Sequence, residues 1–135
     1  DIININVSIL MFVYRVEHKV YGTGPYTCTQ NKCRNLIDSH NHLLDSTKPS
    51  WATEGFWSLK NTDKYRACCN SIESLLNWFD WFSDYLHELT NFHVVKYSVD
   101  DEYVKDGRSG LQSAFMADLA TKVDSIPIDR IEEWF

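Results

Sequence analysis

The spacing of hydrophobic residues predicts one long amphipathic helix over residues 71–91. Its apolar positions recur at the three- and four-residue intervals that place side chains on one helix face. They are Ile72, Leu75, Leu76, Phe79, Phe82, Leu86 and Leu89. Asn70 is placed to cap this helix, and Glu73 stands three residues later, as in a capping box.

Two other segments have the pattern of strands. Residues 7–16 are apolar at successive positions, which is typical of a strand covered on both faces. Residues 93–99 alternate well enough for a second strand, and the order of helix and strand suggests that one packs on the other. Residues 31–44 and 114–123 have apolar positions near helical spacing. The predicted fold class is therefore α+β, a small sheet with a central N-terminal strand packed against the long helix and shorter helices.

The length of 135 residues suits one compact domain. Because the first methionine is Met11, we expect residues 1–10 to be an extension or a leader, and residues 11–135 to form the domain. The apolar stretch at residues 7–16 is shorter than the roughly twenty residues of a membrane span, and it lacks the features of a signal peptide. The expected location is therefore the cytoplasm.

Charge is distributed unevenly along the chain. Residues 1–69 carry a net charge of +2 and residues 70–135 carry −8, which together give the −6 of the whole chain. The acidic half is either solvated surface or a surface that attracts a basic partner. For the second alternative, the predicted binding residues are Asp80, Asp84, Glu88, Asp100, Asp101 and Glu102, with Trp78 and Trp81 as aromatic contacts.

The class of partner follows from the same charges. A protein that binds nucleic acid directly needs a clustered basic footprint, which this sequence lacks. A basic protein or nucleoprotein complex is the predicted partner, since opposite charge speeds association and exposed aromatic residues supply affinity. Binding to a membrane is not expected.

The cysteines Cys28, Cys33, Cys68 and Cys69 are weak candidates for metal ligands. Their spacing departs from that of zinc knuckles, and adjacent cysteines rarely bind the same ion. The sequence also lacks the glycine-rich loops that hold nucleotide phosphates. It therefore predicts free thiols, with neither a metal nor a cofactor.

The N-terminal region resembles a known group of sequences. Residues 14–18, Tyr-Arg-Val-Glu-His, are followed by Gly-Thr-Gly-Pro-Tyr at residues 22–26, and together they resemble the opening of small phage and prophage proteins. This resemblance implies an accessory protein of the host-cell cytoplasm that acts on host machinery. An inhibitor of a bacterial defence complex, of the anti-CRISPR type, is one such protein, and many of these inhibitors are small acidic domains.

A fainter resemblance is to ADP-ribosyltransferases. In that family an Arg on the first core strand holds the dinucleotide, and a Ser follows on a later strand. Arg15 and Ser58 match these positions, and Gln112 stands where the catalytic motif begins, without the second carboxylate of that motif. The resemblance implies a nucleotide-using enzyme with a cleft around Arg15, His18 and Gln112. The alternative is that Arg15 pairs with an acidic residue at the edge of the sheet.

Overall fold

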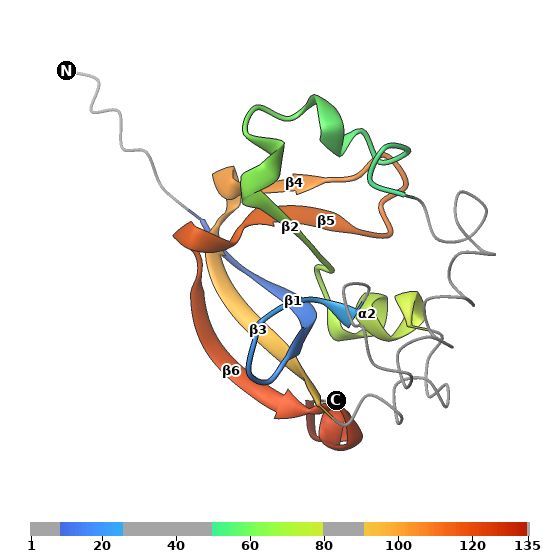
Figure 1. The fold of residues 1–135 in the computed structure, drawn as a ribbon, viewed down its shortest axis with the longest axis vertical. Helices are drawn as coiled ribbons and strands as arrows, with labels where there is room; N and C mark the ends of the chain where they lie inside the picture. Colours follow the sequence, from blue (N-terminus) through green and yellow to red (C-terminus); the bar gives the residue numbers. More distant parts are fainter. Residues whose placement is uncertain (1–8, 26–49, 80–90, 135) are drawn as a thin grey trace.

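The computed structural model describes residues 9–25, 50–79 and 91–134, which contain two three-stranded antiparallel sheets (Figure 1). The first sheet has the order β1 (Leu10–His18), β3 (Phe92–Asp100), β6 (Thr121–Pro127). The second has the order β2 (Tyr65–Cys68), β5 (Ser113–Met116), β4 (Val104–Asp106). One α-helix, α2 (Ile72–Trp78), is described. The 3-10 helices are η2 (Phe56–Ser58), η3 (Thr62–Lys64), η4 (Asp101–Tyr103), η5 (Ala117–Leu119) and η6 (Ile128–Trp134).

The predicted α+β fold is wrong, because the described chain is built mainly from strands. The long amphipathic helix is absent, since α2 ends at Trp78 and Phe79 is its C-cap. Asp80 follows directly, and a carboxylate at the C-terminal end of a helix opposes the helix dipole. The remainder of the predicted helix, residues 80–90, lies outside the described residues, as does the predicted helix at residues 31–44.

Three details of the predicted layout are also corrected. Ser71 rather than Asn70 is the N-cap of α2, and its Oγ accepts a hydrogen bond from the Ser74 N–H at 3.1 Å. The N-terminal strand β1 lies at the edge of its sheet, and β3 is the central strand. Residues 114–123, predicted as a helix, form most of β5, the turn η5 and the start of β6. Both faces of β5 are covered, so its apolar residues are consecutive and do not alternate.

The strands predicted at residues 7–16 and 93–99 are confirmed as β1 and β3, which pair along nine residues each. Even-numbered residues of both strands face one side of the first sheet, and odd-numbered residues face the other side. Each side is covered over only part of its length. This arrangement explains why β1 is apolar at successive positions, as a strand covered on both faces should be.

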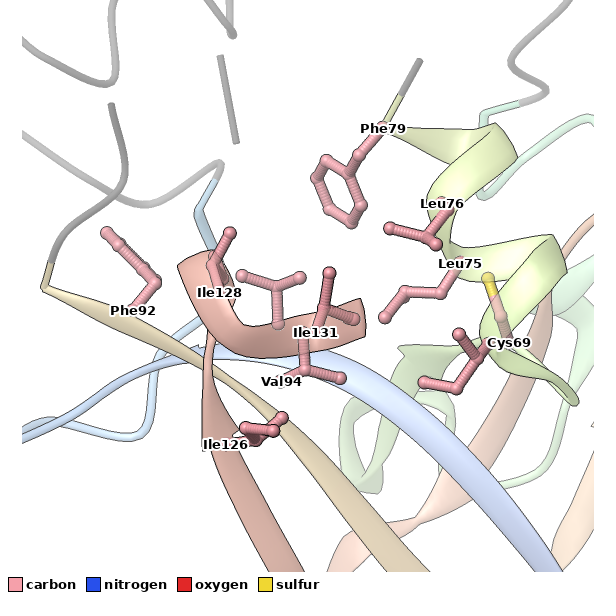
Figure 2. Packing of buried hydrophobic residues seen from close by; sticks show 11 residues of the cluster. Cys69, Leu75, Leu76, Phe79, Phe92, Val94, Ile126, Ile128 and Ile131 are labelled. Atoms are coloured by element: carbon pink, nitrogen blue, oxygen red, sulfur yellow. The ribbon is translucent and has the colours of Figure 1, made fainter. Parts of the chain in front are cut away.

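The first core covers the even-numbered face toward the end of β1 that holds Val16. There the side chains of α2 and η6 pack against β3 and β6 (Figure 2). Tyr14 lies at the border of this core, with its ring 6.1 Å from that of Trp134. The buried members are Val16, Cys69, Ile72, Leu75, Leu76, Phe79, Phe92, Val94, Ile126, Ile128 and Ile131.

The second core covers the odd-numbered face toward the opposite end, where the second sheet packs on the first (Figure 1). Its buried members are Val13, Cys68, Val95, Tyr97, Val99 and Phe115. The far face of the second sheet carries a smaller cluster around Phe56, held in place by Glu54. Glu54 is buried, and its Oε1 accepts a hydrogen bond from the Ser109 N–H at 2.8 Å, which joins the 50–58 segment to the turn between β4 and β5.

Candidate functional site

The acidic residues Asp100, Asp101 and Glu102 lie together where β3 ends and η4 begins. Asp101 and Glu102 are exposed, and the Asp101 N–H donates to the Ile9 carbonyl oxygen at 2.9 Å. The negative charge of Glu102 raises the pKa of the neighbouring Tyr103 phenol, because it opposes loss of the phenolic proton. These three predicted binding residues therefore form one acidic cluster beside the start of β1.

Two large apolar side chains are exposed next to this cluster. Leu10 is paired with Asp100 across the β1–β3 ladder and is 66% exposed, and Phe12 is 49% exposed. Both point to the even-numbered face, at the end that α2 and η6 leave uncovered. The Lys96 Nζ lies 4.1 Å from the centre of the Phe12 ring. We call Leu10, Phe12, Asp100, Asp101 and Glu102 the β1 surface.

The other predicted binding residues are placed differently. Asp80, Asp84, Glu88 and Trp81 lie outside the described residues. Trp78 is half-buried, packs against the first core and lines a cavity beside β1. Among the described residues, Phe12 is an exposed aromatic side chain on the same face as Leu10, which pairs with Asp100, and the sequence analysis did not single it out.

The cavity beside β1 has a volume of about 90 Å³. It is open to solvent on one side and mostly apolar. Its walls come from β1, the end of β2, α2 and the turn before β5. The residues that define its chemistry are Arg15, Gln112, Leu75, Trp78 and Phe79.

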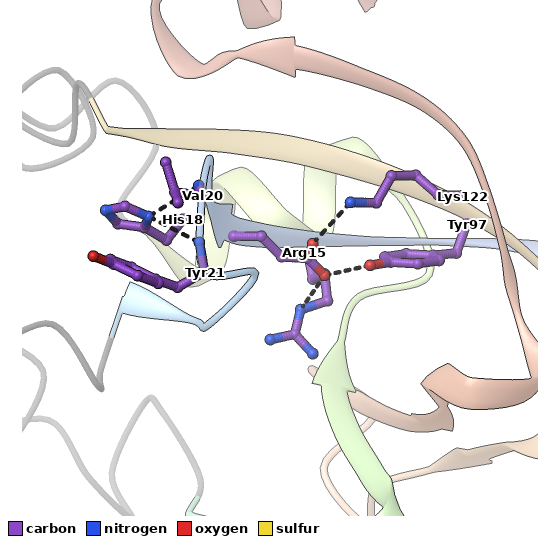
Figure 3. Close-up of polar contacts among 7 residues, drawn as sticks. Arg15, His18, Val20, Tyr21, Tyr97 and Lys122 are labelled. Carbon is purple, nitrogen blue, oxygen red and sulfur yellow. Dashed lines mark hydrogen bonds and ion pairs between the residues drawn. The ribbon is translucent and has the colours of Figure 1, made fainter.

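Arg15 is held by a buried carboxylate (Figure 3). Its Nε lies 3.0 Å from Glu17 Oε2 in an ion pair that is not an aligned hydrogen bond. The same oxygen accepts a hydrogen bond from the Tyr97 hydroxyl, and the half-exposed Lys122 places its Nζ 3.5 Å from Glu17 Oε1. Burial lowers the pKa of Arg15, and the charge of Glu17 counteracts part of that effect. The expected pairing of Arg15 with an acid at the sheet edge is confirmed.

The residues that the transferase resemblance implies are only partly brought together. Arg15 and Gln112 line the same cavity, whereas Ser58 and His18 do not. The Ser58 Oγ donates to the Gly55 carbonyl oxygen at 2.7 Å in an exposed turn. His18 Nδ1 accepts from the Val20 N–H at 3.1 Å and fixes the turn after β1 (Figure 3).

The cysteines at the end of β2 are free thiols. Cys68 and Cys69 are both buried, while Cys28 and Cys33 lie outside the described residues. Desolvation raises the pKa of Cys68, and it raises the pKa of Cys69 to about 12. Within the described part of the chain, no three residues of the metal-binding types are grouped.

The Cys68 and Cys69 thiols are expected to resist alkylation in the folded protein. With a pKa of about 12 in place of 9.0, the thiolate fraction of Cys69 at pH 8 falls by a factor of about a thousand, since each pKa unit is tenfold. Peptide mapping after treatment with iodoacetamide, with and without urea, measures this. Labelling at Cys69 as fast in the native protein as in urea contradicts it.

Sequence reasoning missed Glu17 as the partner of Arg15, although a signal for it was present. Side chains two apart on a strand share a face, so the i, i+2 spacing of Arg15 and Glu17 places them side by side. Tyr97 lies on the same odd-numbered face but opposite Val13, so its hydrogen bond to Glu17 depends on the side-chain packing and not on local spacing. Exposure of Leu10 and Phe12 depends on where the covering elements end, which local spacing does not encode.

The fold and its surfaces define a small antiparallel β protein with a buried charge network and an acidic, partly apolar face. The chain belongs to the Bacteriophage T4 Y00F protein family, whose family model matches residues 11–129. The resemblance to phage proteins is thereby confirmed at the level of a phage protein family. No curated protein and no solved structure matches the chain. Across the described residues, no helix has the length and apolar character needed to cross a membrane.

Proposed function

We propose that this phage protein binds a basic protein of the host cell through the β1 surface. The observation that carries the proposal is the exposure of Leu10 and Phe12 on a strand whose residue Leu10 pairs with Asp100, the first of three consecutive acidic residues. Exposed large apolar side chains bordered by charged residues are typical of an interaction site. Membership of a phage family supports an accessory role toward the host.

The two parts of the β1 surface have different roles in binding. Asp100, Asp101 and Glu102 attract a basic partner and orient it, so they mainly affect the association rate. Burial of Phe12 and Leu10 against the partner supplies most of the affinity, as anchoring residues do in other interfaces. Lys96 lies over the Phe12 ring, so it would repel a positively charged side chain of the partner at that position.

The class of partner that we propose is a nucleic-acid-binding component of a host complex, such as a defence complex. The groove of such a protein is basic because it contacts phosphates, and carboxylates of an inhibitor can take the place of those phosphates. The acidic residues Asp80, Asp84 and Glu88 extend this proposal beyond the described residues. Their contribution remains a prediction.

Two variants are expected to weaken binding in different ways. The purified protein is immobilised and incubated with a bacterial lysate. Captured proteins are identified by mass spectrometry and then purified. Reversal of Asp100, Asp101 and Glu102 to Lys is expected to lower the association rate about tenfold or more at low salt, and less at high salt. Phe12→Ala is expected to raise the dissociation constant about thirtyfold, as loss of an anchoring residue does. Surface plasmon resonance measures both effects.

Matched controls separate the β1 surface from overall charge. Reversal of the exposed residues Glu73, Asp129 and Glu132 to Lys changes the net charge by the same amount on α2 and η6. Val20→Ala truncates an exposed apolar side chain in the turn after β1, at the other end of that strand. If the control variants weaken binding as much as the β1 variants do, the β1 surface is not the binding site.

A further inference from the structure

The cavity beside β1 lies next to an isolated backbone bridge that joins β1 to the residue after β2. Tyr14 and Cys69 exchange two backbone hydrogen bonds of 2.8 Å, and the chain then turns into α2. Beyond Tyr14, the space beside β1 is bordered by side chains of α2 and by Gly24 and Pro25. The result is a recess whose walls come from several elements of the fold.

A guanidinium group lies in the wall of this recess. Nε of Arg15 faces Glu17, whereas its two terminal nitrogens lie on the side away from Glu17 (Figure 3). A Cβ on Gly24 would lie 3.5 Å from Arg15 Nη2, so that nitrogen lies close to the Gly24 backbone in the cavity wall. The terminal nitrogens of a guanidinium are donors arranged to meet a carboxylate.

Arg15 and Glu17 are the buried charges beside the cavity, since the side chain of Lys122 is 55% exposed and Arg66 is also exposed. Glu17 contacts both Arg15 and Lys122, and the charge of Arg66 also acts on Arg15. The Cys68 and Cys69 thiols stay protonated at neutral pH because burial raises their pKa values, so they add no negative charge. Glu17 contacts the Nε of Arg15, so the terminal nitrogens are the part of the guanidinium that can donate to an anion in the cavity.

We propose that this cavity binds a small organic carboxylate, with its anionic group on Arg15 and its hydrocarbon part on Leu75, Trp78 and Phe79. One guanidinium in a mainly apolar recess suits a singly charged ligand with an apolar body. A phosphate dianion needs more donors than this wall provides. The volume of about 90 Å³ exceeds the space of one water and is smaller than the roughly 150 Å³ of a cavity that holds benzene. Because the cavity is open on one side, a ligand somewhat larger than its enclosed volume fits.

Benzoate is the probe, and benzyl alcohol is the uncharged control of similar shape. NMR titration of the full chain follows the indole N–H of Trp78, which Trp78→Phe assigns. Benzoate is expected to shift this signal saturably, and benzyl alcohol and inorganic phosphate are expected to shift it weakly or not at all. Arg15→Lys keeps the charge and loses the paired donors, so its affinity for benzoate is expected to fall about tenfold.

A second pair of variants tests the site without altering its charge. Ala67 is an exposed residue of β2 that lines the cavity, so Ala67→Leu places a larger side chain there. Ala52→Leu makes the same change at an exposed position outside the lining. Benzoate is expected to bind the Ala52 variant normally and the Ala67 variant weakly. No saturable shift with benzoate, an equal response to benzyl alcohol, or unchanged binding by Ala67→Leu overturns the proposal. None of these outcomes depends on whether the β1 surface binds a partner protein.

Discussion

Replacement of Glu17 by glutamine is expected to lower the free energy of unfolding by about 3–5 kcal/mol, because it leaves the buried Arg15 guanidinium without its counter-charge. The side chains of Arg15 and Glu17 are 12% and 6% exposed, so water cannot replace the lost partner fully. Lys122 adds little, since its side chain is 55% exposed and its charge remains solvated. Urea denaturation followed by circular dichroism measures the loss.

Two further variants identify the source of this effect. Glu73→Gln makes the same substitution at an exposed position of α2, where a change within about 0.5 kcal/mol is expected. The double variant Arg15→Met with Glu17→Leu removes both buried charges, so it is expected to be more stable than Glu17→Gln alone. If Glu17→Gln is no more destabilising than Glu73→Gln, the Arg15–Glu17 pair is not an important contact.

Phe115→Ala is expected to destabilise the protein by about 3–5 kcal/mol, because the ring of Phe115 is 0% exposed between the two sheets. Its centroid lies 5.1 Å from that of the Tyr97 ring, so truncation opens a cavity on the odd-numbered face of the first sheet. Thermal and urea unfolding both measure this loss.

Phe12→Ala is the matched control for that substitution. Phe12 is half exposed, and its removal leaves no enclosed cavity. A loss well below that of Phe115→Ala is therefore expected, and the main contact removed is with Lys96. Equal losses for the two variants mean that the second sheet does not pack on the first through Phe115.

The elements predicted correctly are those whose local pattern has one interpretation. β1 and β3 are long and rich in β-branched and aromatic residues, so the apolar run of β1 and the alternation over residues 93–99 both predict strands. The first turns of α2 also follow their pattern, with Ile72, Leu75 and Leu76 buried. The same spacing gave no information on where that helix ends.

The segment at residues 114–123 shows why a short pattern misleads. Phe115, Leu119 and Val123 recur at a spacing of four, as on one face of a helix. In the structure Phe115 is buried, whereas Leu119 and Val123 are about half exposed. Ala114 and Phe115 are buried in different clusters on the two faces of β5, so the strand lacks the alternation that would have identified it.

The candidate site was predictable only in part, since its residues come from distant segments. The pairing of Arg15 with an acid follows from a charged residue on an apolar strand. The cavity requires α2, the end of β2 and Gln112 to meet beside β1, which depends on tertiary packing. Prediction of the acidic residues at 100–102 needed only their sequence. Leu10 and Phe12 complete the β1 surface because α2 and η6 do not extend over them.

β1 and β3 contribute alternate side chains to two cores, and this couples the unfolding of one core to that of the other. Consecutive residues of β3 belong to different cores, as Val94 and Val95 do. Loss of either core therefore exposes one face of the β1–β3 pair, while the other core depends on the opposite face of the same pair. Neither half is therefore expected to act as an independent subdomain, and the described sheets and α2 are expected to unfold as one cooperative unit. Local opening is expected first at the rims, such as the three-residue strand β4.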